Sequence, residues 1–442
     1  MTKRHGYALL AAIVAVIVVI SAAIYIGVAA DDGSGQNNLA GGRTPRGSAA
    51  PASTGLWVGA WSASPARAEP GTETNGMAGR SVRNIVHTSA GGTSARITLS
   101  NLFGQQPLTI THATIAVAET ANSAAAKADT MTRLTFGGST SVTIPSGQQV
   151  MSDAVPVTIP HDSDVLVTTF SPTPSGPVTY HPHARQTSYL AEGDLTDDVS
   201  GTAYTEATPY WRYVTAVDVL SEESAGTVVA FGDSLTDGDD STVGANHRWP
   251  DRLSDRLRDA AGTDGVPLYS VVNEGIGGNR ILASETGRPS DNPSALSRFG
   301  RDALGHANVK AVVIDLGIND ILRNPNQVDP ATITDGLRTL VQQAHAHGVR
   351  VVGATLMPFK GHGGYSAQRE EVRQAVNAEI RAGKVFDAVV DFDKAVRDPY
   401  DPRELRGDYD SGDHLHPSDK GYQRMAEVVD LRSLSGAVSA AL

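Results

Sequence analysis

The hydrophobic pattern of the chain changes at about Thr227, and this change restricts the possible folds more than any other feature. From Leu56 to Leu220, apolar residues alternate with polar ones in short runs that glycine and proline separate. Such alternation is typical of half-buried antiparallel strands, so residues 56–222 are predicted to form an all-β sandwich domain. After Thr227, strand-like runs alternate with amphipathic helical stretches. Residues 225–442 are therefore predicted to form a doubly wound α/β domain around a parallel sheet.

Five apolar runs in this second region have the length and composition of buried strands: residues 228–231, 268–272, 309–316, 349–356 and 388–392. Between them, apolar residues recur at helical spacing, as in Trp249, Leu253 and Leu257; Ile333, Leu337, Leu340, Val341 and Ala344; and Val372, Val376 and Ile380. A helix after each strand returns the chain to the same edge of the sheet, so the strands are expected to be parallel.

The N-terminus predicts an attachment to a membrane. Lys3 and Arg4 precede an uncharged run of 24 residues from Tyr7 to Ala30, and a helix of about 20 apolar residues spans a bilayer. The basic side should stay cytoplasmic, which places the bulk of the chain outside the cell. The run is longer than the apolar part of a cleaved signal, so residues 1–30 are expected to be a retained single-pass anchor. Cleavage after Val28-Ala29-Ala30, which would give a secreted protein, is the alternative.

The composition excludes several classes of function. Residues 31–55 are rich in Gly, Ser, Pro, Asn and Ala and are predicted to be a flexible linker. The formal net charge of -12 argues against binding to nucleic acid. The chain has no cysteine, which excludes disulfides, thiolate metal sites and cysteine nucleophiles.

Ser234 is the first candidate for chemistry. The run Val228 to Phe231 leads into Gly232-Asp233-Ser234 and stops at a second glycine, Gly238, as a buried strand does when it ends in a sharp turn. Open α/β sheets place their reactive groups at this end of the strands. Small and acidic neighbours are expected to leave Ser234 exposed. A role as a helix cap is the structural alternative.

Two further stretches follow later strands. The loop from Asn273 to Arg280 contains three glycines but fails the dinucleotide-binding pattern, because Arg280 stands where the last glycine should be. Its backbone could still approach a ligand closely. Gly317-Ile318-Asn319-Asp320 follows the run 309–316, and the amide of Asn319 could donate a hydrogen bond into a site or serve in a turn.

Asp413-His414-Leu415-His416-Pro417 supplies a candidate base and an acid. Asp413 and His416 are three residues apart, so the carboxylate can reach the ring, fix its tautomer and stabilise its protonated form. His414 is the rival base. Its position next to Asp413 directs it elsewhere, and it is expected to be structural or to face the substrate.

A metal site is the alternative for the acids and histidines of this region: Asp410, Asp413, His414, His416 and Asp419. No H-E-x-x-H pattern is present, so no metal is expected.

These four stretches, in this order, resemble the blocks of the SGNH, or GDSL, hydrolase family over residues 225 to 430. The resemblance implies a flavodoxin-like sheet and a serine esterase without a cofactor. It further implies that Ser234 is the nucleophile, with His416 as base and Asp413 as orienting acid. The amide of Ser234, Gly278 and Asn319 would form the oxyanion hole, with Gly277 as the alternative to Gly278. Residues 81–87 and 99–104 resemble, more weakly, the β-sandwich that precedes the catalytic part in a subset of the family.

The sequence thus predicts an extracellular, membrane-attached hydrolase of carboxylic esters. Its substrate would be a small molecule, a lipid or an acetylated polysaccharide. Acyl transfer to a sugar hydroxyl, or an inactive surface protein that binds glycans, are the alternatives.

Several other side chains carry competing interpretations. Trp57, Trp61, Tyr210 and Trp211 are expected to be core residues rather than a sugar-stacking platform. Arg248 and Arg280 are expected to be solvated. Asp233 and Asp237 are expected to serve in turns and caps.

Overall fold

The computed structural model describes residues 55–263, 265–287, 291–324 and 328–436. The predicted membrane segment, residues 1–30, and nearly all of the predicted linker lie outside these ranges. No helix within the described ranges is long and apolar enough to cross a bilayer. The described residues belong to one compact unit.

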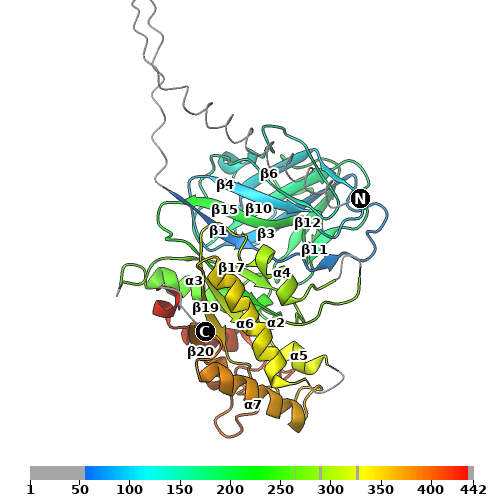
Figure 1. Ribbon diagram of the computed structural model, residues 1–442. Coiled ribbons are helices and arrows are strands. Elements are labelled where there is room, and N and C mark those ends of the chain that lie inside the picture. Colours follow the sequence, from blue (N-terminus) through cyan, green and yellow to red (C-terminus); the bar gives the residue numbers. More distant parts are fainter. Residues whose placement is uncertain (1–54, 264, 288–290, 325–327, 437–442) are drawn as a thin grey trace, which may run out of the picture. The chain divides into compact units, whose positions relative to one another are not determined.

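The first region is rich in β-structure, as predicted, and its strands pair antiparallel in four sheets (Figure 1). The four-stranded sheet has the order β1 (Leu56–Ser62), β15 (Val214–Ser221), β4 (Ala95–Ser100) and β9 (Gln149–Met151). The six-stranded sheet has the order β13 (Glu206–Thr208), β12 (Ser188–Glu192), β3 (Arg80–Thr88), β10 (Ser163–Ser171), β6 (His112–Val117) and β7 (Thr132–Arg133). The smaller sheets are β14 (Trp211–Arg212), β11 (Thr179–His181) and β2 (Arg67–Ala68), and β5 (Leu108–Ile110) with β8 (Val142–Ile144).

The two larger sheets share one apolar core. Alternation places Ala95, Ile97 and Leu99 of β4 inside it, each at most 1% exposed. Trp61 and Trp211 meet edge to face in the same core, with ring centroids 4.9 Å apart. The core interpretation of these two tryptophans is therefore confirmed, and they cannot form a sugar platform.

The second region contains a five-stranded parallel sheet. Its order is β17 (Ser270–Gly275), β16 (Thr227–Gly232), β18 (Val309–Asp315), β19 (Arg350–Ala354) and β20 (Ala388–Val390). Numbered along the chain the order is 2-1-3-4-5, the flavodoxin-like order of doubly wound folds. Each predicted strand is present, although β17 begins and ends later than the apolar run that predicted it.

Helices cover both faces of this sheet. One face packs on α3 (Trp249–Asp259), α8 (Phe392–Val396) and α9 (Asp419–Glu427), and the other on α4 (Ala295–Asp302), α6 (Pro330–Ala346) and α7 (Ala367–Arg381). Two short helices, α2 (Ser234–Asp237) and α5 (Ile318–Leu322), begin directly after β16 and β18. Single 3-10 turns lie at Ala128–Thr130 and Leu431–Leu434. Both short α-helices therefore begin at the carboxyl edge of the sheet, where the chemistry is predicted.

Strand β1 of the first region runs beside β17, the edge strand of the parallel sheet (Figure 1). The Gly59 amide donates to Thr227 Oγ1 at 3.0 Å, and the Val271 amide donates to Ser89 Oγ at 3.1 Å. The first region thus satisfies the Val271 amide of β17, a backbone group that an exposed edge strand would leave open.

Candidate active site

The turn from β16 into α2 places Ser234 at the carboxyl edge of the sheet. Asp233 is the N-cap of α2 and accepts the amide of Leu235 at 3.0 Å, so its predicted capping role is confirmed. Gly238 ends the helix with a φ of 96°, a conformation that glycine adopts without strain. Ser234 is 5% exposed, so the prediction of an exposed serine was wrong. The strands and helices around it leave only the side that faces the cleft open.

His416 connects Ser234 to Asp413. Its Nε2 lies 2.8 Å from Ser234 Oγ, and its Nδ1 lies 2.6 Å from Asp413 Oδ2. A carboxylate can only accept, so Nδ1 carries the hydrogen and Nε2 is left to accept the hydrogen of the serine hydroxyl. The three side chains that the sequence predicted to act together are therefore in contact, in the order that general-base activation of a serine requires.

Asp413 is held by the chain around it. Its Oδ1 accepts the amides of Leu415 at 2.9 Å and His416 at 2.8 Å. Burial would raise the pKa of Asp413, but these amides and the His416 ring outweigh burial and keep its pKa below the ordinary value. Asp413 is thus ionised at neutral pH.

Two more carboxylates lie near the ring of His416. Asp239 Oδ2 is 3.9 Å from its Nε2, and Asp240 Oδ2 is 3.9 Å from its Nδ1. Together with Asp413 they would stabilise the imidazolium that forms when His416 takes a proton.

Gly277 and Gly278 differ in what their amides can do. The Gly277 amide donates to Asp237 Oδ2 at 3.0 Å, whereas no acceptor among the described residues binds the Gly278 amide. Gly278 has a φ of 71°, and a side chain there would collide with the guanidinium of Arg323. The geometry therefore favours Gly278 over Gly277 as the backbone donor.

Asn319 lies in the first turn of α5, beside the same cleft. Its Nδ2 donates one hydrogen bond to Asp233 Oδ2 at 3.0 Å, and an amide nitrogen has a second hydrogen to offer. Burial raises the pKa of Asp233 to about 7, although Leu235, His416 and Asn319 lower it. Asp233 thus both caps α2 and holds the Asn319 amide.

Ser234 and His416 open into a cleft of about 410 Å³. Its lining is mostly polar or basic: Arg67, His183, Ser234, Asp239, Gly277, Gly278, Asn319, Leu322, Arg323, His362, Gly364, Leu415 and His416. Arg67 and His183 come from the β-rich region. That region therefore supplies part of the cleft wall, which sequence reasoning did not predict.

A buried histidine of β11 reaches the same loops. His181 Nδ1 contacts the Ser64 carbonyl at 2.9 Å, and its Nε2 contacts Asp237 Oδ1 at 2.9 Å. Both partners are acceptors, so both ring nitrogens carry hydrogen and the ring is an imidazolium. Burial lowers the pKa of His181, but Asp237 and Ser64 outweigh burial and the pKa is raised. Asp237 thus links His181 to the Gly277 amide, a role beyond the turn and cap predicted for it.

Arg298 of α4 is a second residue that sequence reasoning missed. It is fully buried and donates to the Gly232 carbonyl at 2.8 Å, the Glu274 carbonyl at 2.9 Å and Asn279 Oδ1 at 3.0 Å. It therefore ties the ends of β16 and β17 to the glycine loop. An arginine between apolar positions of an amphipathic helix, with Asp302 one turn later, was the available signal.

Other predicted residues lie elsewhere. His414 pairs with Asp410 at 2.6 Å and is half exposed, and Asp419 pairs with His247 at 2.7 Å.

Arg248 is 5% exposed and bonds Asp251, so the prediction that it is solvated was wrong. Its guanidinium lies against the first turn of α3, where it donates to both carboxylate oxygens of Asp251. Arg280 is partly buried and donates to the Ser284 carbonyl at 3.1 Å.

In the described part of the chain, two groups of side chains have ligand atoms within 4.8 Å of one another: His183 with Asp237 and Asp239, and Asp240 with Asp413 and His416. Asp237, Asp413 and His416 make the hydrogen bonds described above, His183 Nδ1 contacts Asp239 Oδ1 at 2.7 Å, and Asp240 is an ion-pair partner of His416, so these contacts account for the proximity.

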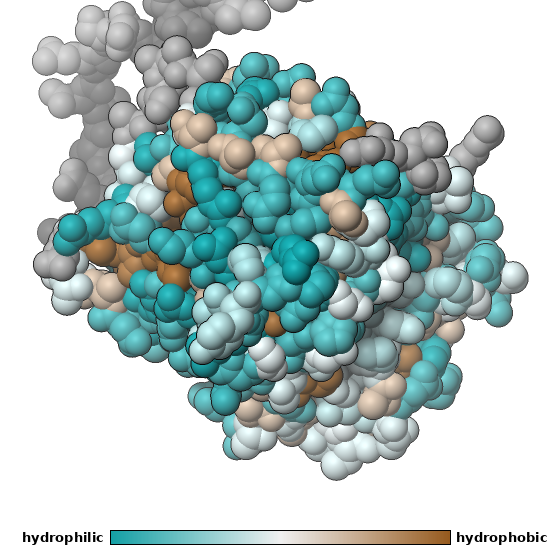
Figure 2. Space-filling view, turned by 90° about the horizontal axis from the view of Figure 1, so that it is seen from below, coloured by the Kyte–Doolittle hydropathy of each residue, from teal (hydrophilic) through white to brown (hydrophobic). Residues whose placement is uncertain are grey.

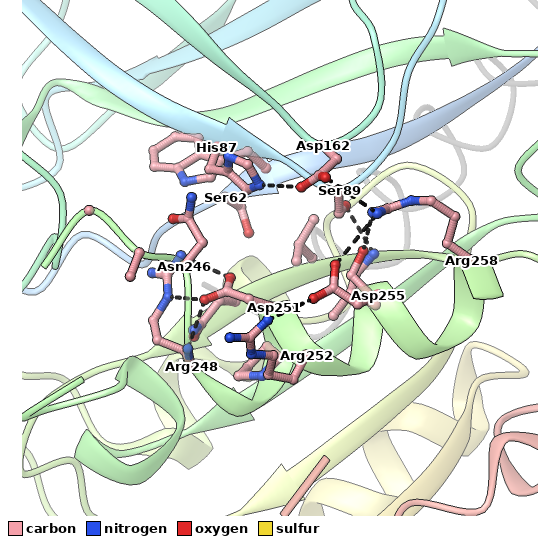
Figure 3. A pocket seen from close by; sticks show the side chains of 18 of the residues that line it. Ser62, His87, Ser89, Asp162, Asn246, Arg248, Asp251, Arg252, Asp255 and Arg258 are labelled. Atoms are coloured by element: carbon pink, nitrogen blue, oxygen red, sulfur yellow. Dashed lines mark hydrogen bonds and ion pairs between the residues drawn. The ribbon is translucent and has the colours of Figure 1, made fainter. Parts of the chain in front are cut away.

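A second cavity, of about 310 Å³, lies between the β-rich region and α3 (Figure 3). Its charged side chains pair with one another: His87 with Asp162 at 2.9 Å, Arg248 with Asp251 at 2.8 Å and Arg252 with Asp255 at 3.3 Å. Ser234 is not among the residues that line it.

Comparison with known proteins gives a family for the second region. Residues 230–424 match the model of the GDSL-like Lipase/Acylhydrolase family. No curated protein is similar enough to this chain to count as a match.

Several solved structures are similar to about half of the chain. An aryl esterase from M. smegmatis is 19% identical, with 48% of this chain and 100% of that chain covered and a TM-score of 0.37. An acetylxylan esterase from Geobacillus stearothermophilus is 21% identical, with 49% and 98% covered and a TM-score of 0.35. A carbohydrate acetylesterase from Sinorhizobium meliloti is 18% identical, with 45% and 94% covered and a TM-score of 0.35.

The sequence blocks, the order of the parallel strands and the family match all concern the same residues. Residues 230–424 of this chain are therefore similar to the GDSL-like Lipase/Acylhydrolase family.

Proposed function

We propose that this protein hydrolyses carboxylic esters through an acyl-enzyme on Ser234. The observation that carries the proposal is the unbroken hydrogen-bond chain from Asp413 through His416 to Ser234 Oγ at the cleft. In the first step Ser234 Oγ attacks the ester carbonyl while His416 Nε2 takes the hydroxyl proton. His416 then returns that proton to the leaving alcohol. Water, activated by the same nitrogen, releases the acid and restores Ser234.

The negative charge that develops on the carbonyl oxygen needs donors fixed in advance. The amides of Ser234 and Gly278 and the second Nδ2 hydrogen of Asn319 are the candidates beside the nucleophile. Each donor of this kind typically lowers the barrier by about 3 to 4 kcal/mol. Asp413 keeps the His416 ring oriented throughout and stays ionised.

The polar lining of the cleft favours short or polar substrates. Leu322 and Leu415 are its two large apolar side chains, and the remaining lining groups are polar, basic or glycine. The face of the molecule in Figure 2 is mostly hydrophilic, with hydrophobic residues in small separate patches. A long lipid chain would find little apolar surface in this cleft, so we favour small acyl esters and acetylated carbohydrate.

The test is hydrolysis of p-nitrophenyl esters of increasing acyl length by the chain from Leu56 onward, beside its Ser234→Ala variant. We expect activity that is highest for the shortest acyl groups and that disappears in the variant. Activity that survives in Ser234→Ala would exclude this serine. Product that appears only on an added sugar acceptor would reassign the reaction to acyl transfer.

We also propose, from the N-terminal sequence alone, that residues 1–30 attach the enzyme to the cell membrane with its catalytic part outside. Fractionation of cells that produce the full chain should place it in the membrane, accessible to added protease. N-terminal sequencing of the mature protein distinguishes a retained anchor from a cleaved signal. Full-length protein in the soluble cytoplasmic fraction would contradict both.

A further inference from the structure

Two guanidinium groups line the cleft beside the proposed oxyanion glycine. Arg323 follows α5 directly and lies against Gly278, because any side chain at position 278 would meet its guanidinium. Arg67 belongs to β2 of the β-rich region and lines the same cleft. The side chains are 46% and 32% exposed, respectively. Both cations are therefore open to a ligand that is bound at Ser234.

The described residues leave most of the donors on these two side chains unpaired. Arg323 donates through Nη1 to Glu285 Oε1 at 2.7 Å. Arg67 Nη2 is 3.9 Å from Glu285 Oε2, beyond hydrogen-bond distance, and Arg67 Nε is buried without a partner. Each guanidinium has five N–H groups. One glutamate therefore serves two arginines and satisfies few of their donors.

The arginines of the second cavity provide a comparison for the ion-pair partners of Arg67 and Arg323. There, Arg248, Arg252 and Arg258 each reach an aspartate on their own helix, at 2.8, 3.3 and 3.5 Å (Figure 3). Arg67 and Arg323 together have one glutamate, Glu285, as their ion-pair partner, and they are the pair that lies beside the nucleophile.

We propose that Arg67 and Arg323 form a subsite for a carboxylate carried by the substrate, and this inference rests on the ester hydrolysis proposed above. A planar guanidinium matches a carboxylate with two parallel hydrogen bonds, and two guanidiniums on one side of a cleft fix its position. The substrate class is an ester that bears a carboxylate on its acyl part or on its alcohol part, such as an acylated acidic sugar.

The charge of the rest of the molecule makes this subsite necessary for such a substrate. The net charge of -12 repels anions at long range, Asp239 lines the cleft, and Glu285 is paired with Arg323. Asp239 is paired with His183 at 2.7 Å, and Asp291 also faces Arg67. Without the free donors of Arg67 and Arg323, an anionic ester would be disfavoured next to Ser234.

The experiment compares matched esters that differ in one carboxylate. Mono-p-nitrophenyl glutarate and p-nitrophenyl valerate test the acyl side. p-Acetoxybenzoate and its methyl ester test the alcohol side. We expect kcat/KM for the charged member of one pair to exceed that of the neutral member by about tenfold or more, as charge-assisted hydrogen bonds provide. This preference should shrink at high salt, and the pair that shows it locates the carboxylate.

Variants assign the preference to the two arginines. Arg67→Gln and Arg323→Gln should each bring the charged-to-neutral ratio toward one, and Arg323→Lys should restore part of it. Arg338→Gln is the matched control, because Arg338 lies on α6 and pairs with Asp335 and Glu379. That control should keep the ratio of the natural chain. Thermal unfolding confirms that each variant is folded.

The outcomes separate this inference from the function on which it rests. Equal kcat/KM for charged and neutral esters, or a ratio that survives both glutamine variants, overturns the carboxylate subsite. Hydrolysis of neutral esters that depends on Ser234 would still stand in that case. No turnover of any ester, charged or neutral, overturns the proposed function and this inference together.

Discussion

The pKa values of the carboxyl groups close to Ser234 differ because each side chain has different contacts. Asp413 accepts two backbone amides and the His416 ring, and its pKa is lowered. Asp315, at the end of β18, is 1% exposed, and its Oδ2 has no partner among the described residues. Burial raises the pKa of Asp315 well above its ordinary value, and Asp233 raises it further. The same residue type thus has a lowered pKa at one position and a raised pKa at the other.

The raised pKa of Asp315 makes stability depend on pH. Below about pH 4, where an aspartate of the unfolded chain is protonated, both states carry the proton. As the pH rises above this value the unfolded state loses its proton first, so the free energy of unfolding falls until Asp315 in the folded protein also ionises. Each unit of pKa difference corresponds to about 1.4 kcal/mol.

We therefore expect Asp315→Asn to be more stable than the natural chain at neutral pH, with a difference that shrinks toward pH 4. Melting temperatures of both proteins between pH 4 and pH 7 measure this difference in stability. A difference that stays constant with pH would show that the carboxyl group is not the cause.

His416 and His414 give a second prediction at this scale. His416 contacts Ser234 and Asp413, whereas His414 pairs with Asp410 and is half exposed. His416→Ala should lower kcat/KM for an ester by about four to six orders of magnitude, as loss of a catalytic base does. His414→Ala should change it by a few-fold at most. Steady-state kinetics on one ester distinguish them, and an equal loss in both variants would contradict the assignment.

The sequence could predict the residues of the site whose contacts are local. Asp413 and His416 lie in one turn, and Ser234 and Asn319 directly follow buried strands. Arg67 and His183 could not be predicted, because they belong to the β-rich region and only the packing of that region brings them to the cleft. The same holds for His181, whose partner Asp237 is 56 residues away.

At the scale of elements, periodicity over a long stretch predicted α3, α6 and α7, and a short helix was missed. Helix α4 was missed because it is short and carries Arg298, Arg301 and Asp302. Strand β17 extends past its apolar run to Gly275, where any Cβ would meet the backbone of Asp237. These elements owe their position to contacts with α2 and the glycine loop, and such contacts leave no periodic pattern.

The contact between β11 and α2 predicts an effect on catalysis. His181 holds Asp237, and Asp237 holds the Gly277 amide next to Gly278. His181→Phe should loosen this loop and lower kcat by about tenfold or more with little change in KM, because the donor it positions acts in the transition state. Steady-state kinetics at saturating ester measure it.

His87 provides the control for this prediction. It is also a histidine of the β-rich region between two acceptors, Asp162 and Asp164, but it lines the second cavity (Figure 3). His87→Phe should lower stability and leave kcat near that of the natural chain. Equal losses of kcat in the two variants would show a general loss of structure instead of a loss of positioning.

For the molecule as a whole, the fold class of each region could be predicted from the sequence. The packing of the two regions against each other could not. Alternation before Thr227 and strand–helix alternation after it gave a β-rich region and a parallel sheet. This packing depends on single side-chain and backbone contacts that leave no periodic pattern in the sequence. The Asn308 side chain donates to the Trp57 carbonyl at 2.8 Å, and the Ala66 carbonyl accepts the Asn292 amide at 2.7 Å. Buried Ser64 also contacts Glu274 and Arg298.

These contacts predict that the two regions unfold together. The β-rich region covers β17, supplies Ser64 to the buried Arg298 and Glu274 pair, and holds the Asp237 loop through His181. Removing it would leave a buried arginine and carboxylate short of partners and expose an edge strand, and losses of this kind each cost about 1 to 3 kcal/mol. A two-domain protein with a weak interface would instead melt in two steps.

We therefore expect one cooperative transition in urea for the chain from Leu56 onward. Tryptophan fluorescence and esterase activity should be lost at the same midpoint. Trp61 and Trp211 report on the β-rich core, whereas Trp249 of α3 and the activity report on the parallel sheet, so separate unfolding of the two regions would divide the fluorescence change into two steps. The isolated segment 225–442 should be much less stable than the same residues in the whole chain. Loss of fluorescence at a lower urea concentration than loss of activity would show that the parallel sheet stands without the β-rich region, and that the contacts between them contribute little.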